Sequence, residues 1–280
     1  MTPNEKLAAL RGFLTENDLD AVIVPSTDPH QSEYPPKRFR CRAYLTGFHG
    51  SAGTAVVTHD RAGLWVDSRY YLEAEQAVES TEFELFKTGL PGVPSPARWI
   101  ASEFPTGGRV GVDASVFTPA DRDRWSGTWK SQGIELVPTT DPFVAIWRDR
   151  PALPAEPVHV HDSTFTGETA QTRLMAIRAE MESYRAGVHV ISTLDDIAYV
   201  LSLRGADVPY NPVFVAFLIL TQGDGILFSD ERRFGDRERE HVEQLGITVR
   251  PYHEFWEQLG ELDGTVLLDP ARTSVAVWDA

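Results

Sequence analysis

The segment STDPHQSEYPPKRFRCR, residues 26–42, concentrates side chains that could do chemistry. Asp28 followed by Pro29 resembles a helix N-cap with proline at the first helical position, and a proline pair ends the segment. The sequence therefore predicts about one helical turn on which His30 and Glu33 share a face. Such a pair could act as acid and base or supply two metal ligands. The competing interpretation, a capped turn that satisfies the backbone and a neighbouring domain, is favoured because no third ligand or orienting carboxylate stands at useful spacing.

Two arginines occupy positions at which α/β proteins often present functional groups. Arg69, followed by Tyr70, lies between the predicted strand GLWVDS and the next helix,. Arg204 ends a predicted helix in a loop that glycine and prolines make rigid,. Either guanidinium could clamp a carboxylate or a carbonyl group, and a salt bridge at a helix end explains either residue equally well.

A run of basic residues stands out against the acidic composition. Lys37, Arg38, Arg40 and Arg42 occur in a chain of 280 residues with a formal net charge of -15. They could dock onto a carboxylate-rich neighbour, or they could be four solvated side chains on a loop. Cys41 is the only cysteine, so no intrachain disulfide is predicted, and an inert thiol is expected,.

Charge and hydropathy exclude several function classes. The pI is near 4.9, and an anionic surface repels both nucleic-acid phosphates and anionic membranes,. No apolar run approaches the roughly 18 residues that a membrane span requires, and the N-terminus lacks the features of a signal peptide. We therefore predict a cytoplasmic protein with no nucleic-acid or membrane partner.

The order of predicted elements repeats along the chain. The first half is predicted to contain, in order, a helix, a strand, two hairpin-linked strands, a helix, a strand, a helix and a strand,. The second half follows the same order,. Trp99 and Trp256 lie 157 residues apart, and Asp113 and Asp269 lie 156 apart. Short links THDRAG and TQGDG join adjacent strands as hairpins, so the sheets are mixed. The predicted fold is α/β, with two tandem similar domains, each a mixed β-sheet flanked by helices.

A proline-rich stretch marks the change of domain. The prolines of the segment RDRPALPAEPVHVHDS favour an extended conformation, as in a linker that few contacts cross,. The predicted domains are therefore residues 1–155 and 156–280. The second domain stops soon after its last strand, so we expect it to be truncated and the chain to be the front of a longer protein.

Several distinctive motifs are spread over most of the chain. They are DPHQSEY, FHGSAGTAVVT, WVDSRYYLEAE, GVD at Gly111, IWRDRP at Ile146, TLDDIAYVLSLRGADVPYNPVF and the closing VLLD. Together and in this order they resemble one family, the cytosolic three-domain form of aminopeptidase P, or Xaa-Pro aminopeptidase. One departure is Ser68, where the family commonly has glycine, which could alter the turn that presents Arg69.

The resemblance implies two creatinase-type N-terminal domains followed by a catalytic domain of the pita-bread fold. In the family that third domain holds two metal ions, typically manganese, and removes an N-terminal residue that precedes proline. None of its five ligands can be assigned in this chain, so no catalytic residue and no cofactor is predicted here. His30, Glu33, Arg69, Tyr70 and Arg204 become candidates for the substrate-access rim or a domain interface. The implied partners are proline-containing peptides, the chain's own catalytic domain and, as a candidate, a second subunit.

Two other hypotheses remain open. The tandem domains could form a free-standing module that binds a peptide or protein partner. Alternatively, the chain could be an enzyme by itself that uses His30 and Glu33, which predicts turnover of a Xaa-Pro peptide by these 280 residues.

Overall fold

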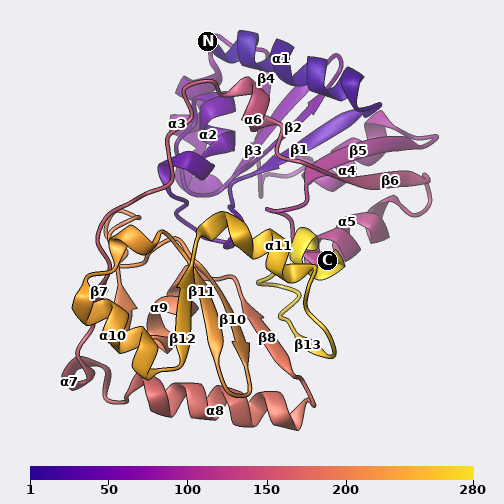
Figure 1. Cartoon of the computed structure of the whole chain (residues 1–280). Coiled ribbons are helices and arrows are strands. Elements are labelled where there is room, and N and C mark those ends of the chain that lie inside the picture. The colour runs from indigo at the N-terminus through magenta and orange to yellow at the C-terminus, as the bar shows by residue number, and fades with distance from the viewer. The chain divides into compact units, whose positions relative to one another are not determined.

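The computed structural model describes all residues, 1–280, and contains two compact units (Figure 1). Unit 1 comprises residues 1–28, 33–151 and 274–276. Unit 2 comprises residues 29–32, 152–273 and 277–280. No helix of the chain is long and apolar enough to cross a membrane.

Unit 1 is built on a six-stranded mixed sheet with the order β4-β3-β2-β1-β5-β6. The hairpin strands β2 and β3 are antiparallel to each other and to β1, whereas β4, β5 and β6 pair in parallel with their neighbours. The strands are β1 Ala21–Pro25, β2 Thr54–Thr58, β3 Ala62–Val66, β4 Phe83–Lys87, β5 Gly108–Asp113 and β6 Ile134–Thr139. The helices and 3-10 turns are α1 Pro3–Glu16, η1 Lys37–Phe39, α2 Cys41–Thr46, η2 Ser68–Tyr70, α3 Tyr71–Val78, α4 Pro96–Glu103, α5 Pro119–Trp129 and α6 Phe143–Ile146.

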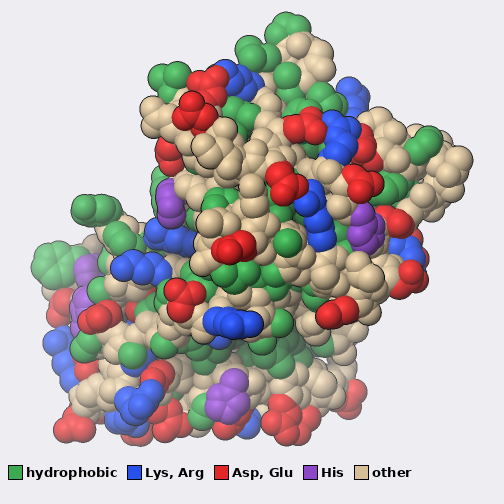
Figure 2. Space-filling model, turned by 90° about the horizontal axis from the view of Figure 1, so that it is seen from above, with side chains coloured by type: hydrophobic (Ala, Val, Ile, Leu, Met, Phe, Trp, Pro, Cys, Tyr) green, Lys and Arg blue, Asp and Glu red, His purple; other side chains and the backbone are tan.

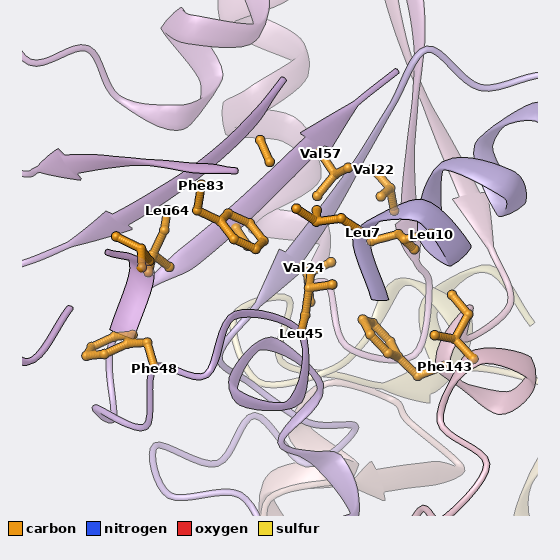
Figure 3. Close-up of a cluster of buried hydrophobic side chains, with 14 of the residues drawn as sticks. Leu7, Leu10, Val22, Val24, Leu45, Phe48, Val57, Leu64, Phe83 and Phe143 are labelled. Atoms are coloured by element: carbon orange, nitrogen blue, oxygen red, sulfur yellow. The ribbon is translucent and has the colours of Figure 1, made fainter. Parts of the chain in front are cut away.

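Strand alternation divides the unit 1 core between the two faces of this sheet. In β1, Val22 and Val24 pack with α1, α2, α3 and α6, whereas Ala21 and Ile23 pack with α4 and α5. Successive strand residues point to opposite faces, so a single buried strand serves both layers. Figure 3 shows the first of these clusters, in which side chains of α1 face the strands. Its labelled members are Leu7, Leu10, Val22, Val24, Leu45, Phe48, Val57, Leu64, Phe83 and Phe143.

Unit 2 has a five-stranded mixed sheet with the order β12-β11-β10-β8-β13. A separate two-stranded sheet pairs β7 with β9. The strands are β7 His159–Val160, β8 Val188–Ile191, β9 Leu203–Arg204, β10 Phe217–Thr221, β11 Gly225–Phe228, β12 Ile247–Arg250 and β13 Val266–Leu267. The helices and 3-10 turns are α7 Ser163–Thr166, α8 Ala170–Ser183, α9 Leu194–Val200, η3 Glu231–Arg233, α10 Asp236–Gln244, η4 Tyr252–Glu254, α11 Phe255–Leu259 and α12 Val275–Asp279.

The two main sheets have the same topology apart from one strand. In each, an antiparallel hairpin lies beside the first strand, and the strands that follow pair in parallel at both sides. The predicted fold class, two tandem similar α/β domains with mixed, helix-flanked sheets, is confirmed, and both predicted hairpins are present. The helix α5 and the edge strand β6 of unit 1 were not predicted, because a run of four charged residues interrupts the apolar pattern of the first and Pro138 interrupts the second.

Two local expectations need correction. Residues 28–34 form turns and bends without a helix, and Gln31 has a left-handed φ of 56°, so His30 and Glu33 do not share a helical face. The repeat register also pairs Trp99 with Trp256, but their environments differ. Trp99 is 3% exposed within the aromatic layer of unit 1, whereas Trp256 is 38% exposed because the preceding residue, Phe255, fills the core of unit 2.

Candidate functional site

The candidate site is a pocket of about 320 Å³ within unit 1, which we call the unit 1 pocket. It opens where β1 and β3 end and where α2 runs into the glycine-rich loop that precedes β2. Such loops at strand ends are where α/β folds commonly place ligands. Its walls are formed by Ser26, Glu33, Tyr34, Pro35, Arg40, Arg42, Ala43, His49, Gly50, Ser51, Tyr70 and Glu73.

Arg42 forms the floor of the unit 1 pocket and is only 4% exposed. Its Nε donates to the Ser26 hydroxyl at 3.0 Å, its Nη1 donates to the Phe48 carbonyl at 3.0 Å, and its Nη2 donates to the Gly50 carbonyl. The guanidinium carbon also lies 4.5 Å from the centre of the Phe48 ring. Burial lowers the pKa of Arg42 to about 10, and the charge of Glu73 only partly opposes this,.

Gly50 must be glycine for this pocket to exist in its present form. A Cβ at Gly50 would lie 2.3 Å from the Phe48 ring and 2.7 Å from the Tyr70 ring, both far inside van der Waals contact. Since those rings carry the packing of the pocket, a larger residue would displace them. The Gly50 carbonyl is thereby kept within reach of Arg42.

Tyr70 forms one wall of the unit 1 pocket. Its hydroxyl bonds to the Ser51 hydroxyl at 2.8 Å, and its ring meets the Phe48 ring edge to face. Exposed carboxylates stand at the rim, where Glu33 and Glu73 line the opening and Glu73 accepts the His49 amide at 3.3 Å. The pocket therefore combines a cationic floor, hydroxyl groups on one wall and anionic groups at the mouth.

Of the sequence-predicted candidates, Glu33 and Tyr70 lie in this pocket and Arg69 does not line it. The Arg69 side chain is 58% exposed and pairs with Asp67, to which its Nε donates at 3.0 Å and its Nη2 at 2.8 Å. Hydrogen bonding to Asp67 raises the pKa of Arg69 and lowers the pKa of Asp67. Arg69 remains cationic and lies 5.1 Å from the ring centre of Tyr70.

His30 lies in unit 2 and is 1% exposed. Its Nδ1 is 2.8 Å from the Ser192 carbonyl, and its Nε2 is 3.0 Å from the Tyr252 hydroxyl. Its ring centre lies 4.4 Å from that of Phe217. Both ring nitrogens of His30 therefore have hydrogen-bond partners within unit 2.

Arg204 is half-buried in unit 2, in the short strand β9. Its Nη1 donates to the carbonyls of Ala198 at 2.7 Å and Leu203 at 2.9 Å. Burial lowers the pKa of Arg204, with a smaller contribution from the Arg173 cation. Arg204 therefore provides a hydrogen-bond donor for carbonyl groups at and just beyond the C-terminal end of α9 and forms no salt bridge there.

The basic run is divided by the fold. Arg38 donates to the Pro151 carbonyl at 2.8 Å, Arg40 donates to the Pro35 carbonyl at 2.8 Å, and Arg42 is buried in the pocket floor. Of these four residues only Lys37 is exposed, so the run is not a single docking surface. On the face shown in Figure 2, acidic and basic side chains are interspersed. Cys41 is a free thiol whose pKa burial raises, as expected for an inert cysteine,.

Sequence reasoning placed Arg42 on a surface and did not connect it with Ser26, Ser51 or Glu73. A signal was present, because Arg42 precedes the pair Ala43-Tyr44 as Ile197 precedes Ala198-Tyr199 in the second half. A basic residue at a position that is apolar in the other copy indicates a local requirement for charge.

This chain belongs to the Creatinase/Prolidase N-terminal domain family. One model of that family matches residues 6–148, and a second model with the same description matches residues 149–280. The chain therefore carries two such domains in tandem, in agreement with the repeated topology of its sheets.

Comparison with individual proteins points to a narrower group. The chain is 37% identical to Aminopeptidase P2 of Arabidopsis thaliana and 36% identical to a probable Xaa-Pro aminopeptidase P of Neurospora crassa, over 98% of its own length in both. It spans only about 40% of the length of these relatives. Among solved structures, it matches X-prolyl aminopeptidase from Caenorhabditis elegans, a cytosolic enzyme with a di-nuclear active site, with a TM-score of 0.90 and 29% identity. That match covers 99% of this chain and 48% of the other.

The residues of this chain do not fit a di-nuclear metal centre. The structure contains no group of three or more His, Cys, Asp or Glu side chains that could hold a metal ion.

Proposed function

We propose that this chain forms the N-terminal portion of a Xaa-Pro aminopeptidase, an enzyme that removes the residue preceding proline at a peptide's N-terminus. The observation that carries the proposal is the fold match over 99% of the chain to X-prolyl aminopeptidase from Caenorhabditis elegans, at a TM-score of 0.90. In this proposal the metal ions and catalytic residues lie outside residues 1–280, and the enzyme is cytosolic like that relative. The two domains then serve substrate access and contacts with a catalytic domain or a second subunit.

The test compares two proteins from the same gene. The purified residues 1–280 and the product of the full reading frame are each assayed on a peptide with proline at position 2, with added Mn²⁺. We expect turnover only by the longer product. Turnover by the 280 residues alone would contradict the proposal, and so would a reading frame that ends at Ala280, which would favour a free-standing binding module.

Arg69 is the residue of this chain that we propose reaches toward substrate or the catalytic domain. The ion pair with Asp67 fixes the orientation of the Arg69 guanidinium, and the group remains exposed,. It is therefore accessible to a substrate or to a neighbouring domain. Unit 2 offers a matched control, since Arg232 is held by Asp230 through the same i, i+2 arrangement. In the full-length enzyme, Arg69→Ala is expected to lower kcat/KM at least 10-fold while Arg232→Ala leaves it unchanged. Equal effects of the two substitutions would remove this role.

A further inference from the structure

Arg42 is a buried cation of unit 1 whose side chain pairs directly with no carboxylate. It is 4% exposed and forms no ion pair within 4.0 Å. Its three hydrogen bonds go to neutral oxygens of Ser26, Phe48 and Gly50, which leaves two of its five N–H groups without a protein acceptor,. A buried charge without a counter-ion is unfavourable, and an anion that reaches it from the pocket would relieve this cost.

Unit 2 shows the balanced version of the same arrangement. The third residue of η3, Arg233, donates to Asp207 at 2.6 Å, and both side chains are almost completely buried. The third residue of η2 in unit 1 is Tyr70, and its partner is the Ser51 hydroxyl. The Tyr70–Ser51 and Arg233–Asp207 pairs each connect the 3-10 turn to a loop that follows a glycine. That glycine is Gly50 in unit 1 and Gly205 in unit 2. Unit 2 therefore supplies its own carboxylate at this position, and unit 1 supplies none.

The fold itself does not require a cation at position 42. The corresponding residue of unit 2 is Ile197, which is fully buried in the core. The correspondence rests on the shared Ala-Tyr pair and on the left-handed residue four positions after the alanine, Gly47 with φ 76° and Ser202 with φ 50°. An apolar side chain therefore occupies the same helix position in the core of unit 2.

The charges around the unit 1 pocket define the ligand. Arg40 and Arg42 are matched by Glu33 and Glu73, so the charged lining is balanced. A simple anion would meet the rim carboxylates, and a simple cation would meet Arg42. We propose that the unit 1 pocket binds a small zwitterion, a free amino acid, with its carboxylate against Arg42 and its ammonium group against the rim carboxylates. The volume of about 320 Å³ accommodates such a ligand,.

Binding is tested by isothermal titration calorimetry on residues 1–280, with the twenty common amino acids as separate probes. We expect saturable binding by at least one of them. The N-acetyl derivative, which lacks the ammonium charge, and the amide, which lacks the carboxylate, should each bind at least 10-fold more weakly. No saturable binding by any amino acid, or equal binding of the N-acetyl derivative, would overturn the proposal.

Variants then locate the site. Arg42→Met is expected to weaken binding more than 10-fold. The control is Arg173→Met in unit 2, which should leave binding unchanged. Arg173 is also buried and donates to the Glu168 backbone carbonyl and the Ser202 hydroxyl, outside the pocket. Glu73→Gln should weaken binding 3- to 10-fold. Because Glu73 is an exposed rim residue, this variant tests the site independently of whether Arg42→Met folds. Unchanged binding in folded Arg42→Met protein, or in Glu73→Gln, would contradict the assignment.

The proposal is independent of the peptidase function proposed above. It concerns equilibrium binding to the 280 residues, and no turnover is needed to measure it. A negative titration would leave the aminopeptidase assay unaffected, and an inactive full-length protein would leave the titration unaffected.

Discussion

The two units share one sheet topology but differ in the side chains that lie between the 3-10 turn and the glycine loop. In unit 2, Arg233 and Asp207 fill the space between the 3-10 turn and the glycine loop with a buried ion pair. In unit 1, the hydroxyls of Tyr70 and Ser51 occupy that place, and Arg42 brings a charge from α2 instead. The difference teaches that the shared topology sets where polar groups can meet, whereas a few side chains decide whether they close the space or leave it open.

The units differ again at the carboxyl end of the strand that pairs in parallel with the first strand. Asp113 in unit 1 and Asp269 in unit 2 each accept the backbone amide two residues later, at 2.8 Å. Unit 1 adds a sixth strand, and the loop after it places Asp141 and Arg150 near Asp113. Unit 2 has no sixth strand, and Asp269 remains exposed. One extra strand therefore changes the environment of an otherwise identical turn.

The largest predicted effect concerns the buried ion pair of unit 2. Arg233→Ala would leave Asp207 buried without its partner, because the Asp207 carboxylate is fully shielded from water. Burial already raises the pKa of Asp207, and the Arg233 charge opposes that rise. We expect a loss of about 3 to 5 kcal/mol in the free energy of unfolding, measured by urea denaturation. The double variant Arg233→Met with Asp207→Asn, which keeps an acceptor for the Val215 amide, should recover part of it,. A single-variant loss below about 1 kcal/mol would contradict the ion-pair assignment.

The next effect is the pH dependence that Asp113 gives to unit 1. Burial, with the Asp141 charge, raises the pKa of Asp113 from 3.8 to about 6, against smaller opposing effects of its Ser115 hydrogen bonds and Arg150. The folded protein therefore binds more protons than the unfolded chain between these two values, so this contribution to stability is present at low pH and is lost as the pH rises to about 6,.

Asp113→Asn keeps an acceptor for Ser115 and removes the charge. At pH 7 we expect it to stabilise the protein by on the order of 1 to 3 kcal/mol and to flatten the pH profile of stability between about pH 4 and 6. Asp269→Asn is the control at the corresponding turn, and it should leave that window unchanged. If Asp113→Asn destabilises the protein at pH 7, the folded protein favours the charged carboxylate of Asp113, and the prediction is wrong.

A smaller effect is expected at the hydroxyl pair of unit 1. Tyr70→Phe removes the bond to Ser51 but keeps the ring against Phe48. Because the two groups are neutral and only partly buried, the loss should be about 1 kcal/mol, well below that of the ion pair in unit 2. Urea denaturation measures both, and a Tyr70→Phe loss as large as that of Arg233→Ala would contradict the contrast between the units.

The smallest effect concerns the exposed Asp-Arg turns that the units share. Arg69→Ala and Arg232→Ala each break an ion pair in water, where such pairs contribute little to stability,. Thermal denaturation should show no measurable change for either variant. A clear loss for one of them would mean that its turn supports packing beyond the ion pair.

Much of the fold could be predicted from the sequence because its determinants are local. Short apolar runs, such as that of β1, and short polar links between strands indicate strands and hairpins within a few residues,. The repeat could be predicted for the same reason, since Trp99 and Trp256, or Asp113 and Asp269, keep nearly constant spacing. The sequence did not reveal helix α5, because four consecutive charged residues separate its few apolar positions, or strand β6, because Pro138 interrupts its apolar pattern.

The amino-acid sequence by itself determined the α/β class, the tandem arrangement and the resemblance to a family. Only the tertiary structure decided what the candidate side chains do. His30 and Glu33 are three residues apart, yet a left-handed turn at Gln31 sends one into the core of unit 2 and the other to the rim of the unit 1 pocket. Arg42 resembles its basic neighbours in sequence, but its acceptors lie 6 to 16 residues away, and burial depends on packing that no local pattern encodes.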